Sequence, residues 1–291
     1  MTDSNPPTID QVCERALRLP CSPALLPRLI AVLQSNDSSA DEIADIVKVD
    51  PGLASSTLRL ANSAFLAAGT PAESVAEAVM RLGQQELYRL ASFALVSRWE
   101  SGAGHGEAGD FCRHALCTAL AAEVLAETTE RVSPQIAYTA GLVCDLGKLA
   151  ITHACDAFYP AIRAYCAEHP GASWTDAEQQ VLGYTHVEVG ARLLRAWYFP
   201  PLLVAVAEHY LDPTQAPAEA LPLLAHLHAA KYIATSFGPG VGEEGFLFAL
   251  NESFLLEWGF TPELLQEAMA IVHERANARL REKLTHGRVA L

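Results

Sequence analysis

The residues best able to do chemistry lie in the segment 141–148, Gly-Leu-Val-Cys-Asp-Leu-Gly-Lys. This segment places the thiol of Cys144, the carboxylate of Asp145 and the ammonium group of Lys148 within five residues. A carboxylate is a suitable ligand for hard divalent cations, whereas a cysteine works against them. The serines offer no alternative nucleophile, because Ser55-Ser56-Thr57 lies in a helical pattern without the G-x-S-x-G turn of a catalytic serine.

Histidines and cysteines elsewhere do not form paired ligands by spacing. His226 and His228 are two residues apart on an expected helix, so they face different directions. The seven cysteines contain no C-x-x-C pair, and Cys112 and Cys117 fall on divergent helix faces. Such scattered thiols fit small buried apolar residues in a reducing cytosol.

The elements that must position these residues are helices. Five pairs place an N-cap residue before a proline at the first helical position: Ser22-Pro23, Asp50-Pro51, Thr70-Pro71, Ser133-Pro134 and Thr261-Pro262. Four further pairs have capping-box spacing: Ser39 with Glu42, Ser74 with Glu77, Thr175 with Glu178, and Thr185 with Glu188. Apolar residues follow these starts at intervals of three and four, so the sequence predicts an all-α fold.

A glycine-rich segment divides the helical pattern. Residues 101–109 contain four glycines in nine positions and predict a linker. It separates an N-terminal helical bundle, residues 1–100, from a second bundle with C-terminal helices, residues 110–291. We expect the two bundles to share apolar faces and to pack together. A further Gly/Pro-rich loop is expected over residues 238–245, before the C-terminal helices.

Composition and charge exclude several classes of protein. The chain is 51% hydrophobic with a mean hydropathy of +0.15, which favours extensive burial. No apolar run approaches the ~18 residues of a membrane span, and the N-terminus lacks the pattern of a signal peptide. We therefore expect a cytoplasmic protein that does not enter a membrane.

The charge is acidic and unevenly distributed. The net charge is −14, and residues 101–270 carry 7 Lys or Arg against 20 Asp or Glu. Only the tail from Ile271 is basic, with 5 Lys or Arg against 2 acidic residues. Because nucleic acids bind clustered basic surfaces, direct nucleic-acid binding is disfavoured.

Eight segments together form a recognisable series. In the first bundle they are 25–27 (Leu-Leu-Pro), 46–53 (Ile-Val-Lys-Val-Asp-Pro-Gly-Leu), 58–64 (Leu-Arg-Leu-Ala-Asn-Ser-Ala) and 78–83 (Ala-Val-Met-Arg-Leu-Gly). In the second they are 141–148, 186–194, 197–200 (Trp-Tyr-Phe-Pro) and 205–210. In this order, from about residue 17 to 235, they resemble the HDOD family, the HD-related output domains of bacterial signalling proteins. The resemblance implies two packed helical bundles, the second with an HD-like fold.

The resemblance also implies where a metal site would lie. In HD-superfamily phosphohydrolases the segment like 141–148 reads G-L-L-H-D-I-G-K, and its His-Asp pair holds a divalent metal that activates water. Carried over by motif, the residual ligands are His114, Asp145, His186 and His209. Cys144 stands in place of a histidine, Lys231 lies near the place of a late aspartate, and the second histidine of a pair falls on Tyr210.

Three interpretations of these residues stay open. They form a satisfied polar network, or Asp145, His186 and His209 hold a residual divalent metal, or the site is an active hydrolase. If Lys231 points into the site, its ammonium group takes the electrostatic place of the metal and pairs with Asp145.

The resemblance thus implies a non-catalytic bacterial signal-transduction module of HDOD type, with no cofactor expected. It would act through a protein partner in trans or a small ligand. The alternatives are a metal-dependent phosphohydrolase or cyclic-dinucleotide phosphodiesterase with an atypical site, or a sensor of metals or nucleotides.

Overall fold

A computed structural model describes residues 5–18, 25–35, 39–65, 71–103, 110–237 and 250–286 of this chain. Throughout these ranges the elements are helices and turns, with no strand, which confirms the predicted all-α class. None of the described helices combines the length and the apolar character needed to cross a membrane.

Six helices precede the glycine-rich segment and ten follow it within the described ranges. The first group is α1 (Ile9–Leu17), α2 (Leu26–Gln34), α3 (Ala40–Lys48), α4 (Pro51–Phe65), α5 (Val75–Leu82) and α6 (Gln84–Ala103). The second group is α7 (Asp110–Thr129), α8 (Pro134–Val143), α9 (Leu146–Cys155), α10 (Tyr159–Glu168), α11 (Trp174–Leu182), α12 (His186–Ala196), α13 (Pro201–His209), α14 (Leu221–Thr235), α15 (Glu252–Glu257) and α16 (Pro262–His286). Short 3₁₀ turns occupy Asp156–Phe158, Pro213–Gln215 and Ala218–Ala220.

Most of the predicted helix starts are confirmed. Helices begin at Pro51, Pro134 and Pro262. The carboxylate of Asp50 accepts a hydrogen bond from the Leu53 amide at 2.9 Å, as an N-cap should. Complete capping boxes are formed by Ser39 with Glu42 and by Thr185 with Glu188.

Two predicted starts near prolines have other outcomes. Thr70 lies outside the described residues, and Pro71 is not helical; α5 begins only at Val75, where Ser74 accepts from the Glu77 amide. The physical reason is that the Ser74 hydroxyl already caps a free amide group in the first turn of α5, so the helix starts there. Ser22-Pro23 and the loop 238–245 lie outside the described residues.

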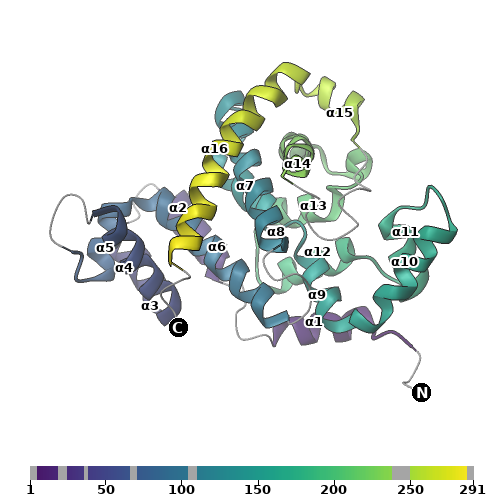
Figure 1. The fold of residues 1–291 in the computed structure, drawn as a ribbon, viewed down its shortest axis with the longest axis horizontal. Helices are drawn as coiled ribbons and strands as arrows, with labels where there is room; N and C mark the ends of the chain where they lie inside the picture. Colours follow the sequence, from purple (N-terminus) through teal and green to yellow (C-terminus); the bar gives the residue numbers. More distant parts are fainter. Residues whose placement is uncertain are drawn as a thin grey trace.

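The two bundles are joined through α6. Figure 1 shows α2 to α5 gathered at one end of the molecule, while α7 to α15 form the larger body. Helix α6 contacts α2 to α5 and also packs against α7, α8 and α9. One contiguous cluster of buried apolar side chains runs through both bundles. Of the expected linker 101–109, the first three residues belong to α6, and 104–109 lie outside the described residues.

Helix α1 packs on the larger body although it precedes the smaller bundle in the chain. It contacts α9 and α12. The Tyr184 hydroxyl donates to the Pro7 carbonyl oxygen at 2.8 Å, and Arg192 pairs with Asp10. The N-terminal segment therefore ties the start of the chain to the second bundle.

A buried carboxylate links three long helices. Glu123 of α7 has a fully buried side chain and pairs with Arg89 of α6 at 2.7 Å. Arg275 of α16 lies 3.9 Å from the same carboxylate and 2.8 Å from that of Glu127. Burial raises the pKa of Glu123, while Arg89 opposes this by favouring the carboxylate. These pairs hold α16 along α7, as seen in Figure 1.

Candidate functional site

Asp145 is the centre of a buried polar cluster. It lies between α8 and α9, and only 3% of the residue is exposed. Two glycines allow the neighbouring helices to approach it closely. A Cβ added at Gly147 would lie 1.9 Å from the His186 carbonyl oxygen of α12, and one at Gly141 would lie 2.7 Å from the Ala119 backbone of α7. The segment 141–148 therefore fits this fold only with glycine at both positions.

Two lysines neutralise Asp145. Lys231 of α14, itself buried, places Nζ 2.6 Å from Asp145 Oδ2. Lys148, one turn into α9, places Nζ 3.4 Å from Oδ1. Burial by itself would raise the pKa of Asp145, but Lys148 and Lys231 overcome this and hold that pKa well below its ordinary value. The carboxylate is therefore ionised and paired inside the protein.

Tyr210 joins Asp145 to His186. Its hydroxyl donates to Asp145 Oδ1 at 2.7 Å and lies 2.8 Å from His186 Nε2. Burial and the neighbouring Asp145 raise the pKa of Tyr210 well above its ordinary value, so the phenol keeps its proton. Because that proton goes to Asp145, His186 Nε2 acts as a donor to Tyr210. The Lys231 ammonium group also lies 4.7 Å from the centre of the Tyr210 ring.

Glu178 completes the far side of the cluster. Its Oε2 lies 2.7 Å from His186 Nδ1 and accepts from the His186 amide at 2.8 Å. Its Oε1 accepts from Trp174 Nε1 at 3.1 Å. A continuous series of contacts thus runs from Trp174 through Glu178, His186 and Tyr210 to Asp145.

The capping box predicted for Thr175 and Glu178 is wrong. The spacing of Glu178 from Thr175 fits such a box, but α11 begins earlier, with Ser173 as N-cap and Asp176 as its partner. The helix start is thus shifted by two residues, and Glu178 faces the core, where it is 1% exposed. An acidic residue eight positions before a motif histidine was the available signal, and spacing by itself does not separate it from a cap.

His114 and Cys144 lie beside Asp145 without strong bonds to it. His114 Nε2 is 3.8 Å from Asp145 Oδ2, and its buried Nδ1 has no hydrogen-bond partner among the described residues. Burial and Lys231 lower the pKa of His114 to about 3, so the ring is neutral. The Cys144 thiol donates to the Gly141 carbonyl at 3.6 Å, and burial raises its pKa to about 12. It is therefore a thiol rather than a thiolate.

His209 does not join this series of contacts. It is the last residue of α13 and is half-buried. It lies near Asp212, whose pKa is lowered chiefly by hydrogen bonds from Thr214 and, to a smaller degree, by His209. Tyr210, the next residue, is the one that turns inward and bridges Asp145 and His186.

These donors do not fit a catalytic metal. Over the described ranges, no group of three or more His, Cys, Asp or Glu side chains is placed to hold a metal ion. Asp145 is the one carboxylate among the carried-over residues, and both of its oxygens are engaged. A neutral thiol and a lysine ammonium group are not ligands for a hard cation.

Similarity to known proteins identifies the family of this chain. A model of the HDOD domain matches residues 19–213, more than half of the chain. This chain belongs to the HDOD family. No curated protein shows significant similarity to it.

Solved structures share the fold of this HDOD chain. A protein of Marinobacter aquaeolei VT8, provisionally described as a signal transduction protein, has a TM-score of 0.72 and 24% identity, with 91% of this chain and 59% of that chain covered. This chain thus spans less than two thirds of that protein. An HDOD domain protein of unknown function from Geobacter sulfurreducens has a TM-score of 0.64 and 22% identity, and 96% of both chains is covered.

A third structure has a different description. It is a protein of Shewanella amazonensis SB2B, provisionally described as a phosphohydrolase, with a TM-score of 0.65 and 26% identity. The comparison covers 90% of this chain and 93% of that one. Signalling and hydrolytic descriptions therefore both occur among proteins that share this fold.

One of the two cations of the cluster lies beyond the matched HDOD segment. His114, Asp145, His186 and Tyr210 all lie within residues 19–213, whereas Lys231 follows it on α14. In this HDOD protein, the helix after the matched segment therefore supplies the second of the two cations that pair with Asp145, the first being Lys148 of α9.

Proposed function

We propose that this HDOD chain is a non-catalytic module of bacterial signal transduction, which acts in the cytoplasm through a protein partner in trans or a small ligand. The observation that carries the proposal is the 2.6 Å contact between Lys231 Nζ and Asp145 Oδ2. A catalytic metal site needs several protein ligands and an open position for water or substrate. Asp145 instead has a lysine on one oxygen and a tyrosine on the other.

The energy of the buried ion pair supports the same conclusion. A metal at Asp145 would have to displace Lys231, which is 4% exposed and would be left without its partner. Breaking a buried pair in this way costs about 3–5 kcal/mol. Such a cost weakens metal binding by roughly two to four powers of ten. The remaining neighbours, a neutral histidine and a neutral thiol, recover little of it.

Hydrolysis and metal content test the proposal together. The purified protein is incubated with Mg²⁺, Mn²⁺ or Fe²⁺ and assayed on cyclic dinucleotides, nucleotides and a generic phosphodiester. Bound metal is measured in parallel by elemental analysis. We expect no turnover above background and no metal retained in stoichiometric amount. Metal-dependent turnover that disappears in Asp145→Asn would overturn the proposal and favour the phosphohydrolase alternative.

A change at Cys144 tests separately whether Lys231 blocks the site. Cys144→His restores a histidine beside Asp145 but leaves Lys231 in place, so we expect it to stay inactive. The double variant Cys144→His/Lys231→Asp removes the competing cation and adds a carboxylate, and it is the smallest change that could admit a metal. Activity from the single change would show that Lys231 does not block the site.

A further inference from the structure

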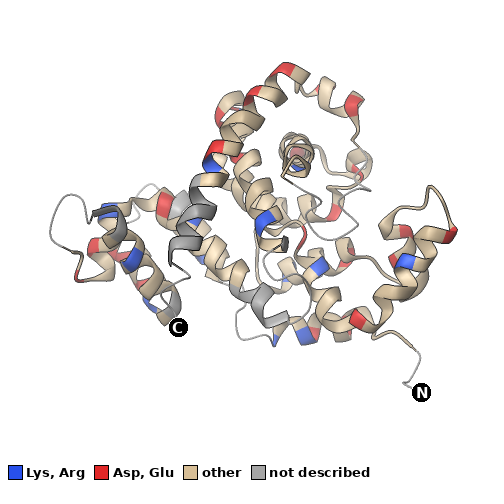
Figure 2. Cartoon of the chain, viewed as in Figure 1, with Lys and Arg blue, Asp and Glu red and all other residues tan. Residues whose placement is uncertain are grey.

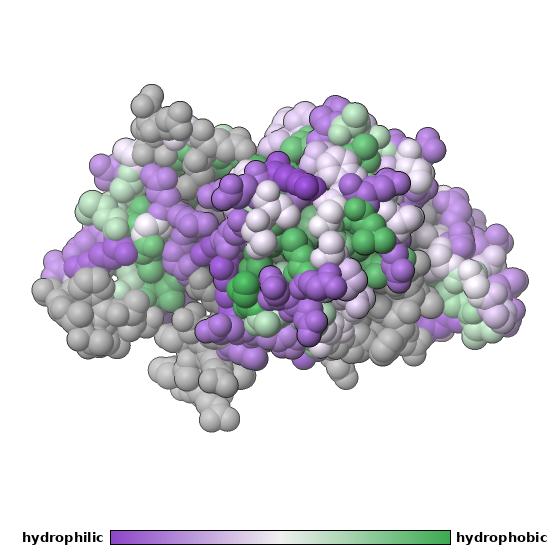
Figure 3. All heavy atoms as spheres, turned by 90° about the horizontal axis from the view of Figure 1, so that it is seen from above, coloured by the Kyte–Doolittle hydropathy of each residue, from purple (hydrophilic) through white to green (hydrophobic). Residues whose placement is uncertain are grey.

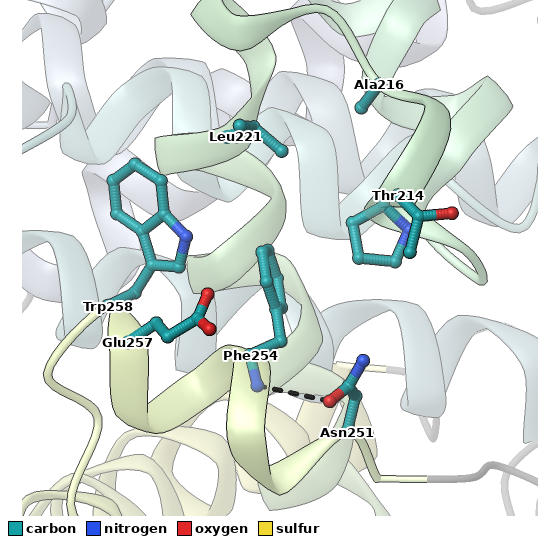
Figure 4. Close-up of a pocket in the computed structure, with 8 residues that line it drawn as sticks. Thr214, Ala216, Leu221, Asn251, Phe254, Glu257 and Trp258 are labelled. Carbon is teal, nitrogen blue, oxygen red and sulfur yellow. Dashed lines mark hydrogen bonds between the residues drawn. The ribbon is translucent and has the colours of Figure 1, made fainter.

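A separate hollow lies between α15 and the chain that joins α13 to α14. Its volume is about 490 Å³, which is within the range of small-ligand pockets. Figure 4 shows its walls, which include Pro213, Thr214, Leu221, Phe254, Glu257 and Trp258. None of these residues belongs to the Asp145 cluster.

The walls of this pocket are fixed to the core. The Asn251 amide donates to the buried His228 Nε2 of α14 at 2.8 Å, and Asn251 Oδ1 accepts from the Phe254 amide at 3.1 Å. The rings of Phe254 and His228 meet edge to face at 6.2 Å. At the other end of α15, the guanidinium group of Arg131 donates to the Trp258 carbonyl. The pocket is therefore largely formed before anything binds.

The chemistry of the walls suits a cation. The rings of Phe254 and Trp258 are 6.5 Å apart, and Figure 4 shows the Glu257 carboxylate beside them. Between residues 211 and 270 the chain has eight Asp or Glu residues against one basic residue, Lys231, which is buried against Asp145. Figure 2 shows acidic residues on α15 and on the first turns of α16. The Arg131 guanidinium group at this end of α15 is bound to the Trp258 carbonyl, and aromatic faces and a carboxylate both attract positive charge.

The surroundings of the pocket also favour a polypeptide as the source of this cation. Leu211, two residues before Pro213 of the pocket wall, and Leu256 of α15 are 39% and 58% exposed. Figure 3 shows apolar residues exposed among hydrophilic ones on the face seen from above. An exposed ion pair and an exposed cation–π contact are each weak, so a free amine would be held weakly. A peptide segment adds apolar contacts around the anchored side chain.

We propose that this pocket binds the guanidinium or ammonium group of an arginine or lysine side chain, presented by a basic segment of a partner protein. The assignment rests on the proposed signalling role, because it states the chemistry of the partner in trans. Its test contains no metal and no phosphodiester. A failure here therefore leaves the non-catalytic role in place, and hydrolytic activity would not affect the pocket.

The experiment follows the indole N–H signal of Trp258 by NMR, assigned with Trp258→Phe. The probe is the capped peptide acetyl-Ala-Leu-Arg-Ala-Leu-Arg-Ala-amide, and its control carries citrulline, a neutral isostere, in place of each arginine. We expect the arginine peptide to shift the signal at low ionic strength, and Glu257→Gln to weaken its binding by about fivefold. Glu252→Gln, on the same helix but outside the pocket, should bind like the parent protein.

Several results would overturn the proposal. They are an unshifted Trp258 signal at millimolar peptide, equal binding of the citrulline peptide, or equal weakening by Glu252→Gln. Acetyl-arginine amide that binds as tightly as the peptide would show that the pocket serves free small cations instead. Self-association in sedimentation experiments that Glu257→Gln abolishes would identify the occupant as the basic tail of a second copy rather than a separate partner.

Discussion

Removing the cation from the buried cluster gives a quantitative test of the structure. In Lys231→Met a side chain of similar length remains, but Asp145 loses the ammonium group 2.6 Å from its Oδ2. Both residues are almost fully buried, at 4% and 3% exposure, so water cannot replace the lost partner. Loss of one member of a buried pair typically costs about 3–5 kcal/mol. Because Lys148 remains 3.4 Å from Oδ1, we expect the lower end of that range.

Urea unfolding at neutral pH, followed by circular dichroism, measures this loss. The double variant Lys231→Met/Asp145→Asn removes both members of the buried pair together, so we expect it to lie within about 1–2 kcal/mol of the parent protein. Lys148→Met is the matched control, because Lys148 is more exposed and makes a longer contact with the same carboxylate. Because both lysines lower the pKa of Asp145, we expect Lys148→Met to destabilise the protein as well, but less than Lys231→Met, since its contact is longer.

The pH dependence gives a second readout with a defined sign. In the parent protein the two lysines, against the effect of burial, lower the pKa of Asp145. The pairing therefore stabilises the fold above the unfolded pKa of about 3.9 and is lost as the pH falls through the folded pKa. In Lys231→Met, one of the two lysines that lower the pKa of Asp145 is lost, so that pKa rises relative to the parent and protonation at low pH relieves the destabilisation. We expect the stability difference between parent and variant to shrink as the pH falls from about 7 to about 3, through the folded pKa of the variant towards the lower one of the parent.

Two results would refute this reasoning. One is a Lys231→Met protein as stable as the parent, because Asp145 would then not depend on this partner. The other is a stability loss that stays constant between about pH 7 and about pH 3, because the loss would then come from packing rather than from a carboxylate that has lost its partner.

Two further substitutions test the construction of the site. Tyr210→Phe should lower the free energy of unfolding, measured in urea, by about 1–3 kcal/mol, because Asp145 and His186 both lose a hydrogen-bond partner. The control is Tyr198→Phe, which should show no comparable loss because Tyr198 is 88% exposed. Gly147→Ala should lower the melting temperature far more than Gly190→Ala, because an added Cβ would lie 1.9 Å from a backbone oxygen at Gly147 and no closer than 3.4 Å to any neighbour at Gly190. Overpacking of this kind costs about 1–3 kcal/mol or more, and equal melting temperatures of the two glycine variants would contradict the close approach of α9 and α12.

The fold class followed from local signals. Helix starts at Pro51, Pro134 and Pro262 depend on an N-cap side chain and on the lack of a proline N–H, and both are encoded within a few residues. The pairing of Lys231 with Asp145 was also among the possibilities that the sequence raised, because a buried carboxylate needs a cation and Lys231 lies near the place of an expected ligand.

Other parts of the site depend on how the helices cross. His209 and Tyr210 are neighbours at the end of α13, and only the packing of that helix decides which side chain reaches Asp145. Likewise, Glu178 has the spacing of a cap, and its burial against His186 follows from where α11 meets α12.

The sequence by itself thus determined an acidic chain of capped helices with a motif aspartate and an incomplete set of the expected metal ligands. Tertiary structure decided the rest, because Glu178 of α11, His186 of α12 and Tyr210 at the end of α13 meet only when these helices pack around Asp145. Local propensity acts over one or two turns of helix, whereas the bond from Lys231 to Asp145 joins residues 86 positions apart. Contacts at that distance are set by the packing of whole helices.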